Sequence, residues 1–69
     1  MVEFDIRVHP KQRQAYIPKE IVETLGYRWK VTPNMKAIAA YPKDATIETV
    51  IRSLEIILDD LKLRRDISQ

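Results

Sequence analysis

The sequence predicts an α+β fold in which strands and one short helix fill the first two thirds of the chain and a long helix follows. Three observations support this fold class. Apolar and charged residues alternate over residues 2–8, as in a half-buried strand. A short segment at 18–25 is bounded by proline and glycine, and from residue 46 the apolar period becomes that of an amphipathic helix.

The N-terminal segment is expected to form a β-hairpin. The strand predicted at 2–8 (VEFDIRV) places its apolar residues on one face and its charged residues on the other. Pro10 predicts a turn over residues 9–12, and residues 13–17 (RQAYI) predict a second short strand. The apolar face of the first strand consists of Val2, Phe4, Ile6 and Val8.

A short helix is predicted at 18–25, between Pro18 and Gly26. Proline suits the first helical turn, and glycine suits a position of positive φ just past a helix end. Two helical turns are too few for stability in isolation, so this helix must be held by other parts of the protein. Two further strands, at 27–31 and 36–41, are predicted on either side of a turn at 32–35.

The C-terminal segment predicts an amphipathic helix over residues 46–65, with Thr46 as its N-cap. Its apolar stripe can cover the sheet of its own subunit or pair with another chain, and three heptads favour pairing. We therefore divide the chain into a unit at 1–45 and a helical unit at 46–69. The residues expected to support oligomerisation are Val50, Leu54, Ile57 and Leu61.

Length and composition favour a small protein completed by a partner chain. A core built from 69 residues is marginal, and without cysteine there is no disulfide to strengthen it. A homo-oligomer is therefore expected. The sequence contains neither an apolar run of about 20 residues nor a signal-peptide pattern, which predicts a soluble, cytoplasmic protein.

Positive charge is concentrated in the N-terminal part of the chain. Residues 1–45 carry eight Lys/Arg and five Asp/Glu, whereas residues 46–69 carry four and five. Nucleic acid is the natural partner for such an excess, although ordinary surface charge explains it equally well.

Catalytic, metal and cofactor sites are not expected. His9 has no cysteine or second histidine to complete a metal site, so it is interpreted as a solvated turn residue. Asp59 and Asp60 are interpreted as a solvated helix face, and a single glycine excludes the usual phosphate-binding loop. Trp29 could stack on bases, but packing is the favoured interpretation. The aromatic residues expected in the core or at its edge are Tyr16, Tyr27, Trp29 and Tyr41.

The order of elements over residues 4–42 resembles a known DNA-binding family. The match is anchored by Ile-Pro-Lys-Glu-Ile at 17–21 and Leu-Gly at 25–26, and it resembles the AbrB/SpoVT-type, swapped-hairpin (MazE-like) domain. The downstream pattern is similar to the archaeal branch, whose members often carry a C-terminal helix. This resemblance implies a β-barrel formed by an intertwined homodimer, with the short helix capping the barrel.

The resemblance also suggests which residues bind DNA. Arg7 stands where the family's first-strand arginine commonly touches DNA. The family's glycine-arginine pair falls on Arg13-Gln14 without a gap, or on Gln12-Arg13 with one inserted residue, and the glycine is missing either way. Lys11 and Lys19 are added from their position and charge. Such cations neutralise phosphates, and an arginine can also read guanine; the alternative for Arg7 is an ion pair with a nearby carboxylate.

The sequence therefore predicts a DNA-binding transcriptional regulator or small chromatin protein, located with the nucleoid. It is expected to bind double-stranded DNA as a homodimer, which its C-terminal helix could extend to a tetramer. The alternative is the antitoxin of a toxin-antitoxin pair, whose C-terminal segment binds a toxin protein. Toxin-wrapping tails tend to be disordered before binding, whereas residues 46–65 are regularly patterned, which favours oligomerisation.

Overall fold

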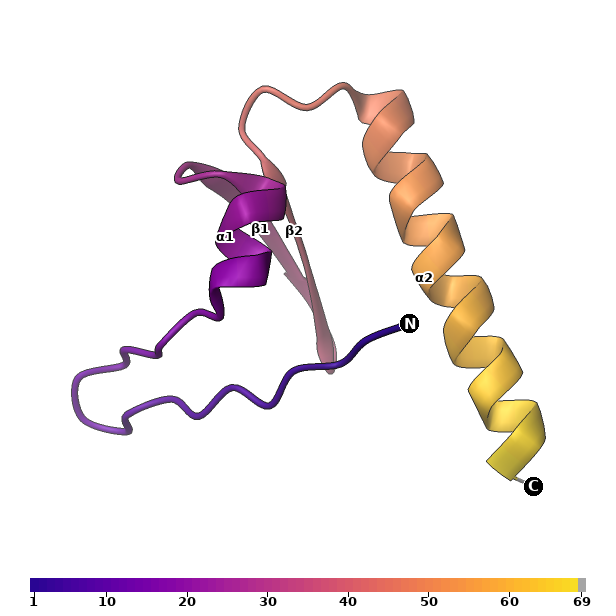
Figure 1. Cartoon of the computed structure of the whole chain (residues 1–69), viewed down its shortest axis with the longest axis horizontal. Coiled ribbons are helices and arrows are strands. Elements are labelled where there is room, and N and C mark those ends of the chain that lie inside the picture. The colour runs from indigo at the N-terminus through magenta and orange to yellow at the C-terminus, as the bar shows by residue number, and fades with distance from the viewer. Residues whose placement is uncertain (69) are drawn as a thin grey trace.

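The computed structural model describes residues 1–68 and has the predicted α+β composition (Figure 1). A short helix is followed by a two-stranded antiparallel sheet and a long C-terminal helix. In chain order the elements are α1 (Lys19–Leu25), β1 (Trp29–Asn34), β2 (Ala37–Pro42) and α2 (Ile47–Ser68).

Helix α1 lies where the sequence predicts it, between its proline and its glycine. Pro18 occupies the N-cap rather than the first helical position, with φ −53° and ψ 141°. Gly26 ends the helix with φ 79° and ψ −156°, a combination that is nearly exclusive to glycine. Its N–H donates to the Val22 carbonyl at 2.7 Å, and its own carbonyl accepts from the Trp29 indole Nε1–H at 2.7 Å. The first bond completes the last turn of α1, and the second closes the connection between α1 and β1.

The strand and turn boundaries predicted after α1 are wrong by several residues. Residues 32–34 belong to β1 rather than to a turn, and the connection to β2 is only Met35 and Lys36. Pro33, which lies within the predicted turn, pairs with Ile38 inside the hairpin. Proline is tolerated here because both strands of a two-stranded sheet are edge strands, so a missing N–H need not remove a ladder bond. Met35 makes the tight connection with a positive φ of 48°.

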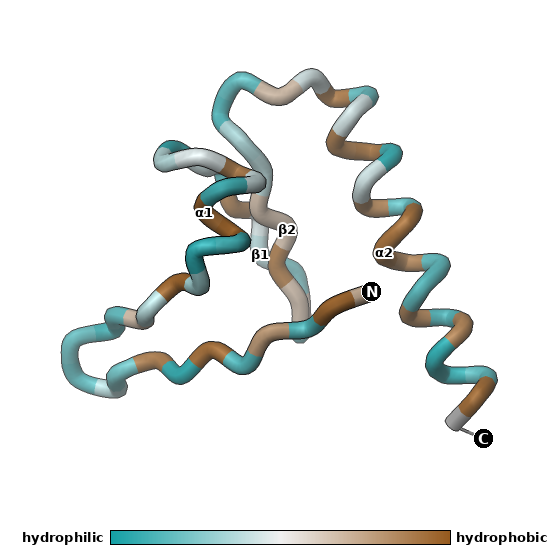
Figure 2. Tube along the Cα trace, viewed as in Figure 1, coloured by the Kyte–Doolittle hydropathy of each residue, from teal (hydrophilic) through white to brown (hydrophobic). Residues whose placement is uncertain are grey.

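The strands predicted at 2–8 and 13–17 are not formed as strands. The two segments run beside each other but meet in a single antiparallel bridge, between Val8 and Ala15. A β-strand is defined by a row of backbone hydrogen bonds to a neighbouring strand. These two segments form almost no such bonds within the chain. We call residues 5–17 the arm: in Figure 1 it projects away from the hairpin and α2. Its residues alternate between polar and apolar along the first half (Figure 2).

Helix α2 confirms the predicted C-terminal helix and its cap. The Thr46 hydroxyl accepts from the Thr49 N–H at 3.3 Å, and Glu48 lies in the first turn, where a carboxylate favours the positive end of the helix dipole. The helix continues to Ser68, three residues beyond the predicted end. The last residue of the predicted unit, Gln69, lies outside the described residues.

The chain alone has no buried core. No residue among residues 1–67 is buried, and the accessible surface is 6835 Å². A folded monomer of 8.1 kDa exposes about 4,500 Å², so this chain exposes roughly half as much again. Its radius of gyration is 13.7 Å, against about 11 Å for a single domain of this length.

The aromatic residues divide between exposed and half-buried positions. Tyr16 and Tyr27 are 86% and 94% exposed, so the prediction that they pack in a core or at its edge is wrong for the single chain. Trp29 and Tyr41 are half-buried, as are Ile21, Val22 and Leu25 of α1. The apolar faces are thus formed by the sequence pattern but are left partly exposed in the single chain.

Candidate nucleic-acid interface

The tip of the arm is a tight four-residue loop, Pro10 to Arg13. The His9 N–H donates to the Gln14 carbonyl at 2.7 Å, and the Arg13 N–H donates to the His9 carbonyl at 2.7 Å. The Gln12 N–H donates to Nδ1 of His9 at 3.2 Å. These bonds confirm the predicted turn at 9–12. They also give His9 a local structural role, because its ring holds the loop closed.

Arg13 is one of two non-glycine residues with positive φ within residues 1–68, and its φ is 56°. The left-handed conformation costs an ordinary residue about 1–2 kcal/mol relative to the right-handed one. The left-handed conformation is required here because Arg13, the last residue of the loop, turns the chain back into residues 14–17. Arg13 therefore stands in a backbone conformation that glycine would adopt freely.

The bridge between Val8 and Ala15 defines two faces of the arm. Side chains alternate along paired segments, so Val8 and Ala15 share one face and their neighbours share the other. The second face carries the cross-strand pairs Arg7 with Tyr16 and His9 with Gln14. These four residues line one shallow hollow of about 470 Å³ together with residues of the bridge and the loop: Val8, Pro10, Gln12 and Ala15. The sequence analysis did not place Gln14 and Tyr16 beside Arg7, because that placement depends on the register of the Val8–Ala15 bridge.

The structure brings three of the four predicted DNA-binding residues onto the arm. Arg7 lies on the outgoing segment, Lys11 in the loop, and Arg13 at the loop's end, while Lys19 lies outside the arm as the first residue of α1. All four are exposed. Residues 7–19 contain these four cations and no carboxylate, so no negative side chain offsets the positive charge in this part of the chain.

Arg7 takes no part in the ion pairs of the described residues 1–68. The alternative interpretation paired Arg7 with Glu3 or Asp5, but Glu3 is bound to Arg64, with 2.6 Å between Oε1 and Nη1. Within this chain the guanidinium of Arg7 is therefore available to an external anion.

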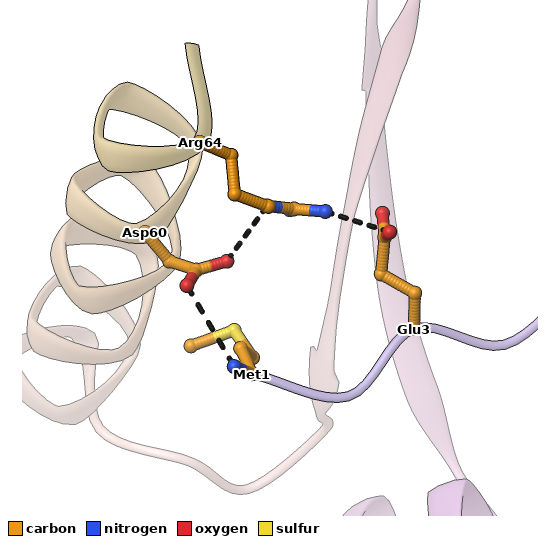
Figure 3. Close-up of polar contacts among 4 residues, drawn as sticks. All are labelled: Met1, Glu3, Asp60 and Arg64. Atoms are coloured by element: carbon orange, nitrogen blue, oxygen red, sulfur yellow. Dashed lines mark ion pairs between the residues drawn. The ribbon is translucent and has the colours of Figure 1, made fainter. Parts of the chain in front are cut away.

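A second polar cluster joins α2 to the start of the chain (Figure 3). Arg64 bridges Glu3 and Asp60, its Nε lying 3.1 Å from Oδ2 of Asp60, and the Met1 amine lies 3.7 Å from Oδ1 of the same carboxylate. The prediction that Asp60 is simply solvated is therefore wrong: its side chain is 19% exposed and ion-paired. Poor alignment leaves Oδ2 of Asp60 and Nε of Arg64 buried without a hydrogen bond. Hydrogen bonding to Glu3 raises the pKa of Arg64.

The residues predicted to support oligomerisation face an unfilled apolar groove. The groove runs between α2 and the β2–α1 side of the chain in two sections, of about 370 and 320 Å³. Leu54 and Ile57 line both sections, while Val50 lines the first and Leu61 the second. The opposite wall includes Leu25, Ala39 and Ala40. Leu54, Ile57 and Leu61 remain 40–48% exposed, so α2 faces its own sheet without covering it.

Other kinds of site find little support in the described part of the chain. Residues 1–68 contain no cluster of three or more side chains suited to hold a metal ion. None of the described helices combines the length and apolar character needed to cross a membrane. Comparisons with protein-family models, with curated proteins and with solved structures gave no match to this chain.

Proposed function

We propose that this protein is a DNA-binding transcriptional regulator or small nucleoid-associated chromatin protein that contacts duplex DNA through its arm. One observation carries the proposal: residues 7–19 present four exposed cations and no carboxylate, three of the cations on a segment that projects from the molecule. Cations displayed in this way release counterions from the phosphate backbone, which is the main source of non-specific affinity for DNA. No enzymatic step is part of the proposal.

The DNA-binding form in this proposal is a homodimer. The chain exposes roughly 2,300 Å² more than a folded monomer of its mass. Covering that excess on two chains would bury about 4,600 Å², which lies in the range of obligate homodimers. A second copy of the chain is always available as a partner, and it exposes the same apolar faces.

A barrel formed by exchanged hairpins fits the unpaired backbone of this chain. Both outer edges of the β1–β2 hairpin are open, and the arm has a single internal bridge. Extended segments without partners pair readily with the edges of another sheet. The resemblance to the swapped-hairpin family agrees with this arrangement. Arg13 adds support, because its φ of 56° is a glycine-like conformation at the position where the ungapped alignment places the family's glycine.

Binding to random duplex DNA at several salt concentrations tests the proposal. Each phosphate contact contributes about 0.9 to the slope of log affinity against log salt. Two subunits that present Arg7, Lys11, Arg13 and Lys19 set an upper bound of about eight contacts, a slope near 7. We expect a measurable slope below that bound, carried by a species of twice the chain mass. A folded protein that binds no duplex at low salt would contradict the proposal.

A further inference from the structure

We propose that the open end of the β1–β2 hairpin binds the backbone of a second DNA duplex, so that one dimer holds two DNA segments at once. This inference rests on the proposed function, because the arm supplies the contact with the first duplex. We call residues 25–28 and 43–44 the hairpin mouth, since the chain enters β1 and leaves β2 there.

The basic residues of the N-terminal part of the chain fall into two separate groups. All eight Lys/Arg of residues 1–45 lie within residues 7–19 or residues 24–43, four in each range, and neither range contains a carboxylate. Glu20 and Glu23 of α1 separate the two groups. The proposed function uses only the first group. The second group consists of Arg28, Lys30, Lys36 and Lys43.

Backbone pairing at the hairpin mouth brings two cations of the second group together. The Lys43 N–H donates to the Arg28 carbonyl at 3.0 Å, which extends the register of the hairpin by one pair beyond Trp29 and Pro42. Both side chains are exposed, and like charges at opposed positions of a sheet repel each other. Neither side chain takes part in an ion pair of the described residues 1–68. An anion bound between them would relieve this repulsion.

The hairpin mouth forms an open hollow whose side chains suit a phosphate backbone. Its volume is about 620 Å³, and it is lined by Leu25, Gly26, Tyr27, Arg28, Lys43 and Asp44. Tyr27 is 94% exposed, and a phenol hydroxyl, like the two cations, is a common ligand of DNA phosphates. Asp44 adds one carboxylate against these two cations, and Lys30, two residues after Arg28 on the same face, adds a third cation. Small-molecule sites enclose most of their ligand, whereas an open hollow suits a polymer.

The backbone of the hairpin mouth is held by hydrogen bonds on both sides of the hollow. The Gly26 carbonyl accepts from the Trp29 indole Nε1–H at 2.7 Å, and the Ala45 N–H donates to the Pro42 carbonyl at 3.0 Å. The first bond also occupies a carbonyl oxygen that would otherwise repel a phosphate. The chain that carries the cations is therefore preformed, which lowers the entropic cost of binding.

The hairpin mouth and the arm lie at opposite ends of α1 (Figure 1). The arm leads into the lower end of this helix, whereas the connections from α1 to β1 and from β2 to α2 both lie at its upper end. A single duplex that crossed both surfaces would meet the carboxylates of Glu20 and Glu23 between them. Two duplexes, one at each end, avoid these carboxylates.

Retention of one duplex by another tests the inference with the full chain. The protein is bound to an immobilised random duplex at low salt, and a fluorescent random duplex is then titrated. We expect the parent to retain the fluorescent duplex. The variant Arg28→Gln/Lys43→Gln should still bind the immobilised duplex through its arm but lose most of the fluorescent one. Since two subunits lose four cations, the salt slope for the second duplex should fall by up to about 3.6.

A charge-matched variant and the fold of the protein control this experiment. Arg52→Gln/Lys62→Gln removes one arginine and one lysine from exposed positions of α2 and should retain the fluorescent duplex as the parent does. Arg28 and Lys43 contribute only backbone atoms to the hydrogen bonds of the hairpin mouth, so their variant should fold. Circular dichroism and sedimentation check the fold and the mass of each variant.

The outcomes separate this inference from the proposed function. If the immobilised duplex binds the parent but the fluorescent duplex is not retained, the second surface is refuted and the DNA-binding proposal stands. The same conclusion follows if Arg28→Gln/Lys43→Gln retains the fluorescent duplex as well as the parent, because the arms alone then bridge the duplexes. Equal loss of both duplexes in that variant would place the hairpin mouth in the first binding surface and refute a second one. If the parent binds neither duplex, both proposals fail.

Discussion

Arg64, near the end of α2, is ion-paired with Glu3, near the start of the chain, at 2.6 Å. The same guanidinium lies 3.1 Å from Asp60, one helical turn earlier. Glu3 leads directly into the arm, so this cluster ties the C-terminal helix to the base of the segment that carries the proposed DNA contacts (Figure 3). Helix α2 is thereby held near the sheet even though the groove between them is open.

Reversing one charge of this pair should loosen the end of α2. We expect Glu3→Arg and Arg64→Glu each to speed amide hydrogen exchange in the last turns of α2, because each places like charges together. The double variant restores opposite charges at positions 3 and 64 and should recover part of the protection, since a carboxylate at position 64 still lies beside Asp60. Equal exchange rates in the parent and both single variants would show that the pair does not hold the helix.

The pH dependence of this pair follows from the direction of the Arg64 shift. Hydrogen bonding to Glu3 raises the pKa of Arg64, so the guanidinium is stabilised in its charged form by folding. The contribution of this pair to the free energy of unfolding is fully present below the ordinary pKa of arginine. It is lost only as pH rises through the still higher pKa of Arg64 in the folded protein. The difference in melting temperature between the parent and Arg64→Gln should therefore stay constant between about pH 6 and 9.

We predict that the protein is an obligate dimer. Its accessible surface exceeds that of a folded monomer and none of residues 1–67 is buried, so folding and association should occur together. Sedimentation should give twice the chain mass at micromolar concentration, and the melting temperature should rise with protein concentration. A stable, folded monomer with a concentration-independent melting temperature would contradict this prediction.

Truncating the apolar stripe of α2 should be costly if the dimer covers it. Leu54→Ala and Leu61→Ala should each lower the free energy of unfolding by about 2–5 kcal/mol, the usual cost of removing a buried leucine side chain. Leu63→Ala is the matched control, since Leu63 lies on the other side of the helix from Leu54 and is 59% exposed. Denaturant unfolding of the three variants measures the difference.

Removal of residues 46–69 tests the same stripe at the level of assembly. The deletion should lower the oligomeric order or unfold the protein, because the groove residues of β2 and α1 would lose their opposite wall. Unchanged mass and melting temperature would show that α2 is an appendage.

Replacing Arg7 by alanine should weaken DNA binding without loss of fold, because its side chain makes no ion pair within the described residues. If Arg7 reads a base, affinity should fall more for a preferred site than for random duplex. If it only meets a phosphate, both should fall together and the salt slope should shrink by up to about 2, because the dimer loses two phosphate contacts. Arg52→Ala, on α2, removes the same charge away from the arm and should do little. Titration of labelled duplexes compares the two variants.

Arg13→Gly should stabilise the arm while weakening DNA binding. Glycine adopts the φ of 56° without steric cost, so we expect a gain of about 1 kcal/mol per subunit, reduced by the greater freedom of glycine in the unfolded chain. Lys11→Gly is the control, because Lys11 has no positive φ and glycine there should only destabilise. Thermal unfolding measures both. A lower melting temperature for Arg13→Gly than for the parent would show that the loop does not require this conformation.

The sequence by itself determined the elements whose causes are local. Pro18 and Gly26 bound α1, Thr46 caps α2, and Pro10 marks the turn of the arm, all of them features that depend on residues a few positions apart. The stripe of α2 is also local, because helical periodicity alone places its residues on one side. Of the basic residues of the arm, Arg7 and Arg13 were predicted to bind DNA from the family resemblance, and Lys11 from its position and charge.

The tertiary structure decided what depends on pairing between distant segments. Pro33 lies in a segment whose sequence predicts a turn, yet pairing with β2 places it in a strand. Gln14 and Tyr16 join Arg7 on one face only through the register of the Val8–Ala15 bridge, and no local pattern links Glu3 to Arg64. The arm segments alternate like strands but form almost no ladder, because a strand needs hydrogen-bond partners that this single chain does not supply.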